Sequence, residues 1–165
     1  IKPARKSLAK MNGKNASMKL RPHHLIDIVT VYGQGAAFTP HPYGHAVHTV
    51  AEQVLNDLSI PIEFVLGADS ICDPCQHLQP DSSCDDVLEQ LEDRPSKQAY
   101  NDGLDSKLFP YLGMMPGECM TFQAFLERVN THFPGIEQLC THPGEDQSER
   151  RRGLAEGLSK LGITR

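Results

Sequence analysis

The spacing of hydrophobic residues predicts a chain built mainly of helices. In residues 23–32, Leu25, Ile28 and Val29 fall on one helical face, and Pro22 is acceptable in the first turn of a helix. The same apolar spacing predicts three further helices, at 47–58, at 122–133 between a Thr121 N-cap and the Pro134-Gly135 break, and at 147–161.

The remaining stretches carry weaker patterns. Alternation of apolar and polar residues in 60–66 predicts one short strand, and the apolar residues of 87–91 predict a brief helix. A leucine stripe in 104–112 predicts another helix that Pro110 should kink or stop, and 136–140 predicts one more turn. We therefore expect a mainly α fold with a short β element.

Length and charge limit the class of protein. The 165 residues suit one domain, so we expect a basic flexible tail at 1–17 and a single domain at 18–165. The tail has a charge of +5, which leaves −10 on the rest of the chain because the net charge is −5. An acidic body repels phosphates, so we expect no nucleic-acid partner. No apolar run approaches the roughly 18 residues of a membrane span.

The cysteines point to a reducing compartment. The chain has five of them, an odd number, and its first residues lack the apolar segment of a secretory signal. Cytoplasmic location is the expectation, and cysteines at short spacing in the cytoplasm are more often metal ligands or catalytic thiols than disulfides. A disulfide remains an alternative.

Four cysteines form the candidate metal centre. Cys72 and Cys75 form a CxxC turn, and Cys84 follows after eight residues that can fold back onto the same site. We predict Cys140 as the fourth ligand, because it ends a short helical segment from which its side chain can reach a loop. Cys119 lies in a Met- and Gly-rich link and is interpreted as a small core residue. The predicted fold is thus a single small domain of packed helices around a cysteine-ligated metal centre.

Cysteine spacing alone does not separate zinc from an iron–sulfur cluster, because thiolates suit both. Four aspartates crowd the loop, and their negative charge disfavours the more negative reduced form of a cluster. A cluster at this place should therefore have a low reduction potential. The aspartates are Asp73, Asp81, Asp85 and Asp86.

The sequence from 18 to 143 resembles a known family. The motifs are Arg21-Pro22-His23-His24-Leu25, Gly33 and Gly35, the run from Asp69 through Cys72-Asp-Pro-Cys75 to His77 and Cys84, and Leu112-Gly113. They are similar to domain-of-unknown-function family 1284, small bacterial and archaeal proteins thought to bind iron–sulfur clusters. The resemblance implies that four cysteines hold one [4Fe-4S] cluster, and it favours this cofactor over Zn²⁺.

The chain departs from the family pattern at two motifs and in the C-terminal helix. Ile26 and Asp27 stand where the family usually has leucine and cysteine after the paired histidines. Near the C-terminus, Cys140 is present but Pro143 stands where a second cysteine is expected. The departures reduce the family's larger cysteine set to Cys72, Cys75, Cys84 and Cys140.

Histidines supply candidate proton-handling groups. We predict His23, His24 and Asp27 as candidate catalytic residues beside the cluster, with His77 in a similar role or, like them, only structural. A metal site built from the second group, His41, His45 and His48, is disfavoured because no carboxylates stand at suitable spacing.

Three functions follow from these expectations. The first is a redox module in which a cluster with four cysteine ligands exchanges electrons with a protein partner. The second is an enzyme in which three cysteines leave one iron open to a small-molecule substrate. The third is a protein with a structural zinc ion.

Overall fold

The computed structural model describes residues 18–140 and 144–164, so the predicted tail at 1–17 and the Pro143 position lie outside the described residues. Within these ranges the fold is mainly helical, with a short three-stranded sheet. None of the helices in this part of the chain is both long and apolar enough to cross a membrane. The elements are β1 Met18–Leu20, α2 Pro22–Gly33, α3 Val47–Asn56, β2 Pro61–Phe64, α4 Lys97–Tyr111, β3 Cys119–Thr121, α5 Phe122–Thr131, the 3-10 turn η1 Ile136–Gln138 and α6 Gln147–Lys160.

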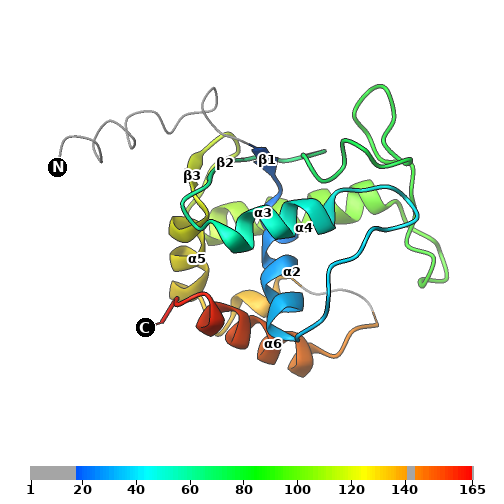
Figure 1. The fold of residues 1–165 in the computed structure, drawn as a ribbon. Helices are drawn as coiled ribbons and strands as arrows, with labels where there is room; N and C mark the ends of the chain where they lie inside the picture. Colours follow the sequence, from blue (N-terminus) through cyan, green and yellow to red (C-terminus); the bar gives the residue numbers. More distant parts are fainter. Residues whose placement is uncertain (1–17, 141–143, 165) are drawn as a thin grey trace.

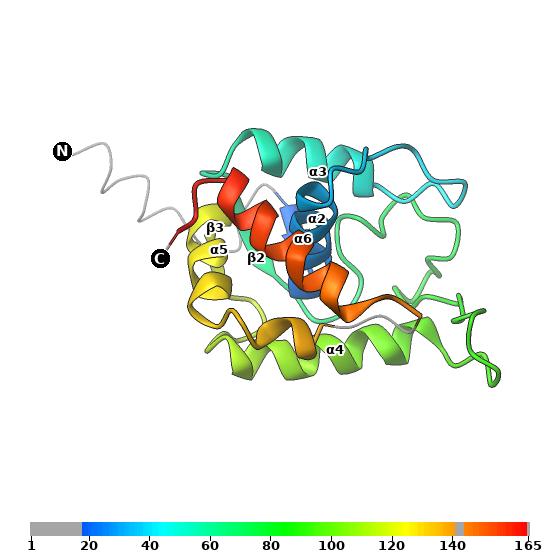
Figure 2. The ribbon, with the colours of Figure 1, turned by 90° about the horizontal axis from the view of Figure 1, so that it is seen from below.

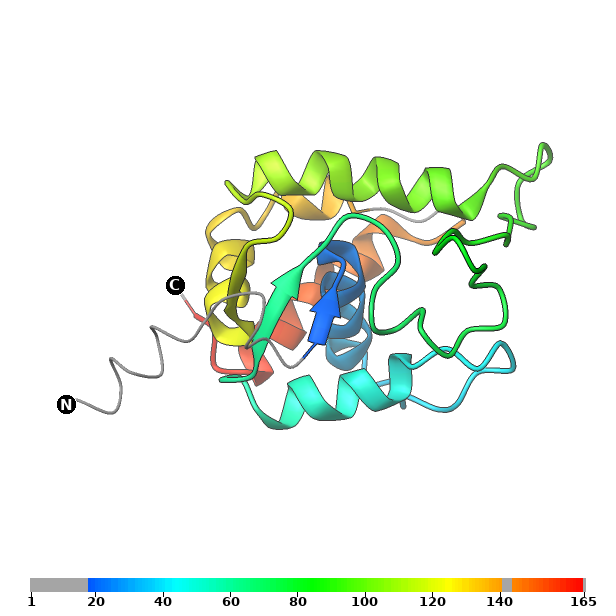
Figure 3. The ribbon, with the colours of Figure 1, turned by 90° about the horizontal axis from the view of Figure 1, so that it is seen from above.

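The sheet has the order β1-β2-β3, with β1 parallel to β2 and β2 antiparallel to β3. Leu20 pairs with Phe64 and Ile62 pairs with Met120. These side chains are buried because alternate residues of each strand point to the same face. Figure 3 shows the strands side by side, with α3 and α4 on either flank.

Helix α2 is the central element of the core. Leu25, Ile26, Ile28 and Val29 are all buried, so the helix is covered on most of its circumference. It lies beneath the sheet in Figure 1, and Figure 2 shows it between α3 and α4, with α6 crossing it.

Glycines set the close approach of α2 and α6. A Cβ atom on Gly157 would collide with the backbone carbonyl of Val29, and one on Gly33 would collide with the carbonyl of Gly153. Only glycine lets the two backbones pack at this separation. The C-terminal half of α2 thereby packs directly against α6.

The predicted helices at 23–32, 47–58, 122–133 and 147–161 are confirmed as α2, α3, α5 and α6. Thr121 caps α5 as predicted, since its hydroxyl accepts a hydrogen bond from the backbone N–H of Ala124 at 3.0 Å. The helix predicted over 104–112 is longer and runs as α4 through Pro110, which lies in the last turn and so ends the helix without breaking it.

Three expectations about the elements need correction. The prediction of a brief helix at 87–91 is wrong. Val87 forms a β-bridge with Ser96, and the segment between them turns back on itself. Strands β1 and β3 were not predicted, since three residues are too few to show alternation. Cys119 lies in β3 opposite Glu63 and is only partly buried, so it is not a core residue.

Two loops meet at one end of the molecule, beyond the N-terminus of α2. We call residues 34–46 the histidine loop and residues 65–96 the cysteine loop; both extend to the right in Figure 1. The backbone N–H of Gln76 donates to the carbonyl of Tyr43 at 2.8 Å, and that of Ala46 donates to Ile71 at 2.9 Å. These bonds hold the two loops together around a hollow.

Candidate functional site

A cavity of about 230 Å³ lies where the two loops, the start of α2 and the start of α4 meet. Three of the four predicted cysteine ligands line it, together with all three candidate catalytic residues. The lining residues used below are Arg21, His23, His24, Asp27, Tyr43, His45, Cys72, Cys75, His77, Cys84, Asp86, Lys97 and Gln98.

Turns in the cysteine loop position the three thiols. The backbone N–H of Cys75 donates to the carbonyl of Cys72 at 2.9 Å, which closes the CxxC turn. Cys84 pairs with Leu78 in a β-bridge, and its N–H donates to the side-chain oxygen of Gln98 in α4 at 2.9 Å. All three cysteines are half-buried.

Asp69 connects the cysteine loop to α2. Its buried carboxylate accepts hydrogen bonds from the backbone N–H of Arg21 at 2.8 Å and from that of Ile71 at 3.1 Å. The same group lies 2.7 Å from Nδ1 of His24 and 3.3 Å from Sγ of Cys72, whose thiol donates to it. Burial alone would raise the pKa of Asp69, but the charge of His24 and the hydrogen bonds outweigh it and lower the pKa to about 2.

The Cys72 thiol is held in its protonated form. Burial, together with the negative charge of Asp69, raises the pKa of Cys72 to about 12. A thiol of this kind is a poor nucleophile, because the thiolate is the reactive form. A metal centre bound here must displace the thiol proton.

A second buried network holds His23. The carboxylate of Asp105 in α4 accepts from the backbone N–H of His23 at 3.0 Å and lies 2.9 Å from Nδ1 of its ring. The Arg21 guanidinium binds Asp105 at 2.9 Å and Asp102 at 2.9 Å. Burial lowers the pKa of His23, an effect that the nearby charge of His24 increases and Asp105 only partly offsets.

The paired histidines thus use different carboxylates but face one cavity. Their ring centroids lie 4.4 Å apart, and each Nδ1 contacts its own aspartate, Asp105 for His23 and Asp69 for His24. An ionised carboxylate only accepts, so the Nδ1 of His24 carries the proton that it donates to Asp69. This hydrogen bond fixes the ring and the tautomer, as it does for many functional histidines.

Cys140 is placed differently from the other predicted ligands. It is buried and is not among the described residues that line the cavity. Its Sγ lies 3.8 Å from Asp27 and 3.8 Å from the Arg150 guanidinium, which itself binds Asp27 at 2.7 Å. Burial, strengthened by the charge of Asp27, raises the pKa of Cys140 well above its usual range. Asp27 therefore contacts Cys140 and also faces the cavity.

Two further histidines, His45 and His77, line the loop side of the cavity. His77 lies 2.8 Å from Asp85 through Nδ1, and its ring packs edge-on against Tyr43 with centroids 4.4 Å apart. Of the second predicted histidine group, His45 lines the cavity and stacks on His41 at 4.4 Å, whereas His41 and His48 are not among the lining residues. The structure therefore places His45 at the cavity, but not His41 or His48.

The donor set of the cavity favours soft metal chemistry. Three cysteines of the cysteine loop line the cavity, and thiolates are ligands of zinc and of iron–sulfur clusters. Among residues 18–140 and 144–164, however, no group of three or more His, Cys, Asp or Glu residues is arranged to hold a single metal ion. A zinc ion with bonds of about 2.3 Å needs its sulfurs close together, whereas a cluster of several irons accepts wider spacing.

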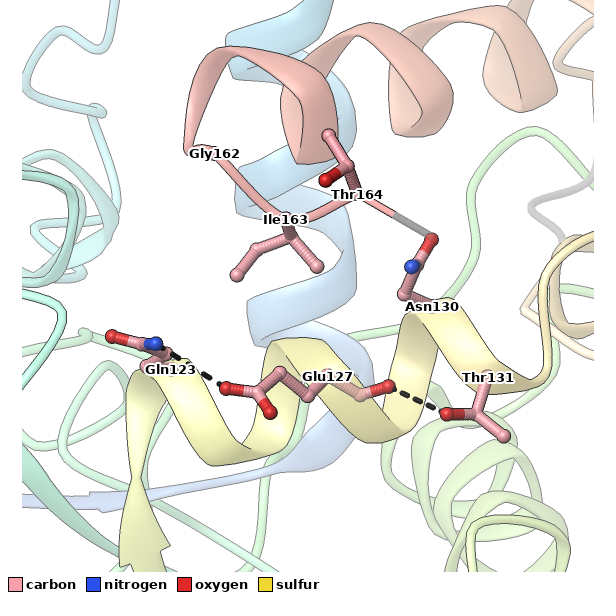
Figure 4. Close-up of a pocket in the computed structure, with 7 residues that line it drawn as sticks. All are labelled: Gln123, Glu127, Asn130, Thr131, Gly162, Ile163 and Thr164. Carbon is pink, nitrogen blue, oxygen red and sulfur yellow. Dashed lines mark hydrogen bonds between the residues drawn. The ribbon is translucent and has the colours of Figure 1, made fainter.

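A larger hollow elsewhere lacks this chemistry. It has a volume of about 560 Å³ and lies between α5 and the C-terminal end of α6, as Figure 4 shows. The residues that line it are Gln123, Glu127, Asn130 and Thr131 on α5 and Gly162, Ile163 and Thr164 after α6. The side-chain amide of Gln123 donates a hydrogen bond to Glu127 at 3.3 Å. No cysteine or histidine is among the described residues that line it.

Sequence reasoning missed the residues that hold the cysteines and histidines in place. Asp69 precedes the CxxC motif by three residues, which is a local signal, whereas Asp105 is 82 residues from His23 and carries none. The chain matches no family model, no curated protein and no solved structure, so its function must be inferred from the residues of the cavity. The resemblance to domain-of-unknown-function family 1284 stays a prediction.

Proposed function

We propose that this protein binds one iron–sulfur cluster of the [4Fe-4S] type and exchanges single electrons with a redox partner. In the proposal its ligands are Cys72, Cys75 and Cys84, which line the cavity, and Cys140. The observation that supports it is that Cys72, Cys75 and Cys84 all line one cavity of about 230 Å³. When bound, the cluster supplies one-electron chemistry that no side chain of the cavity provides.

The surroundings of the three thiols fit such a centre. Asp69, His24 and His77 lie around them as hydrogen-bonding groups, and the charges and hydrogen bonds around a cluster tune its potential. The acidic side chains Asp85 and Asp86 stand next to Cys84 and disfavour the added negative charge of reduction. A low reduction potential follows from this arrangement.

A second candidate is a cluster-dependent enzyme in which one iron stays open to a small-molecule substrate. One observation favours it: Cys140 is not among the described residues lining the cavity, whereas His24 and Asp27 are. For Cys140 to become a ligand, its contacts with Asp27 and Arg150 would have to open. In this candidate the histidines and Asp27 hold or move protons beside the open position.

The test is purification without oxygen, followed by an ultraviolet–visible spectrum and analysis for iron, sulfide and zinc. A broad absorption band with about four irons and four sulfides per chain supports the proposal. Cys72→Ser, Cys75→Ser and Cys84→Ser should each abolish the band. Cys119→Ser is the matched control, because Cys119 lies in β3 away from the cavity, and it should keep the band. A colourless protein with one zinc overturns the proposal.

Cys140→Ser separates the two candidates. A cluster with four cysteine ligands should be lost in this variant, whereas a cluster with three should assemble and show unchanged iron content. Retention of the cluster supports the open-iron enzyme, and its loss supports the electron-transfer module.

A further inference from the structure

A line of hydrogen bonds joins Cys72, a proposed cluster ligand, to His24 through Asp69. The Cys72 thiol lies 3.3 Å from Oδ1 of Asp69, and Oδ2 of the same carboxylate lies 2.7 Å from Nδ1 of His24. The Asp69 side chain is fully buried, and that of His24 is 17% exposed. His24 also lines the cavity. The line thus joins the cluster site to a group that can exchange a proton.

Ligation of Cys72 leaves a charge to be compensated. When Cys72 binds iron as a thiolate, Asp69 loses the S–H donor and two negative groups stand about as close as the thiol and carboxylate do now. Such a buried pair is stabilised by a positive charge added nearby. Arg21 already binds Asp102 and Asp105, so the group on the carboxylate side of Cys72 that can gain a positive charge when the negative charge of the site increases is His24.

Some charged groups near His24 raise its pKa and others lower it. Burial alone lowers the pKa of His24, but Asp69 first and Asp27 less strongly outweigh it, so the pKa is raised. Arg21 and His23, from the same end of α2, oppose protonation, as does His45 from the histidine loop. From α4, Asp105 neutralises Arg21, and Lys97 lines the cavity paired with Asp86 at 3.3 Å.

We propose that His24, positioned by Asp69, is the residue whose protonation is coupled to one-electron reduction of the cluster. The inference rests on the proposed function. An external one-electron donor is oxidised and the cluster gains the electron; one proton from solvent adds to Nε2 of His24, while Nδ1 keeps the proton that it donates to Asp69. The added negative charge of the cluster is then balanced through Asp69 by the imidazolium.

The expected signature is a reduction potential that falls as pH rises. Coupling of one proton to one electron changes the reduction equilibrium tenfold per pH unit, or ~59 mV for a single electron. The dependence should span the pH range between the pKa values of His24 in the oxidised and reduced protein. Asp69 is a positioning residue here, since it holds the ring and does not itself take up the proton.

The experiment is a redox titration of the cluster-loaded full chain with dithionite at several pH values, monitored by electron paramagnetic resonance. The wild-type potential should depend on pH, and His24→Gln should flatten that dependence while keeping four irons per chain. His132→Gln is the matched control, because His132 lies at the end of α5 with Nδ1 bound to the Arg128 carbonyl. It should keep the wild-type slope.

Three results would overturn the coupling. They are a flat wild-type dependence, an unchanged slope in a cluster-loaded His24→Gln variant, and loss of the slope in His132→Gln. If His24→Gln fails to assemble a cluster, redox-difference infrared spectra of the wild type with ¹⁵N-labelled histidine decide instead. Imidazolium bands must appear on reduction, and their absence overturns the inference. Absence of any cluster in the wild type is a different result, and it contradicts the proposed function itself.

Discussion

Asp105 is the residue on which the buried polar network around α2 depends. Its side chain is fully buried and accepts hydrogen bonds from the Arg21 guanidinium and from the His23 backbone. Asp105→Asn leaves the Arg21 charge buried without its inner partner, so we expect a loss of about 3 kcal/mol or more in the free energy of unfolding. Urea denaturation of the variant and the wild type measures it.

Asp102→Asn is the matched control for this prediction. Asp102 binds the same guanidinium at 2.9 Å, but its side chain is 39% exposed and solvent can replace it. We expect a loss of at most about 1 kcal/mol. Equal losses in the two variants would show that burial of Asp105 is not what makes its charge important.

Asp69 gives the protein a specific weakness in acid. Its pKa lies at about 2 in the folded protein against an ordinary 3.8, because His24 and the hydrogen bonds outweigh burial. A lowered pKa stabilises the fold above pH 3.8, and that stabilisation is lost as pH falls from 3.8 toward 2. Asp69→Asn should show a shallower fall of unfolding free energy between pH 4 and 2, measured by urea titrations; an identical slope contradicts the assignment.

At the scale of single residues, the sequence indicates which residues line the cavity better than it indicates which distant side chains bind them. Cys72, Cys75 and Cys84 were expected to share a site because their spacing is short, and they do line one cavity. His23 and His24 were expected beside that site, and both line it. Asp105 was not expected, since nothing near it in the chain indicates that a buried arginine and histidine need its carboxylate.

The packing of α2 against α6 depends on glycine. Gly157→Ala should lower the free energy of unfolding by more than about 1 kcal/mol, because the added Cβ collides with the Val29 backbone and a backbone cannot give way as a side chain can. Gly103→Ala is a matched change in α4, where nothing lies within 4 Å of the added Cβ. That variant should gain about 0.5–1 kcal/mol from helix propensity alone. Thermal unfolding of both variants tests the contrast, and a stabilised Gly157→Ala contradicts the close approach.

Helices were predictable here where they carry an apolar stripe. Helices α3 and α5 show it clearly, and both begin within a residue or two of the predicted starts. The segment 87–91 has too few residues for periodicity to distinguish a turn of helix from a bridged loop, and the pairing of Val87 with Ser96 decides between them. Strand β1 depends on pairing with β2, whose residues lie more than 40 positions later.

At the scale of the whole molecule, the site is assembled by long-range contacts. Arg21 meets Asp105 across 84 residues, and Asp27 meets Arg150 across 123. Spacing along the chain contains no information about such pairs. For this reason the sequence could propose Cys140 as a ligand from its position at the end of a turn, but could not indicate that Asp27 and Arg150 are its neighbours.

The cysteine loop is the part of the fold that the proposed cluster should stabilise most. Around the cavity it has isolated bridges and turns in place of regular elements, whereas α2 is buried in the core. Removing the cluster with a chelator and reductant should therefore raise amide exchange in 72–84 at least tenfold and leave α2 unchanged, because a centre that binds only the folded loop stabilises that loop. Hydrogen–deuterium exchange of the loaded and stripped protein measures the change. Equal exchange in both forms would mean that the loop is held by its own hydrogen bonds, whereas faster exchange in α2 as well would mean that the centre stabilises the whole domain.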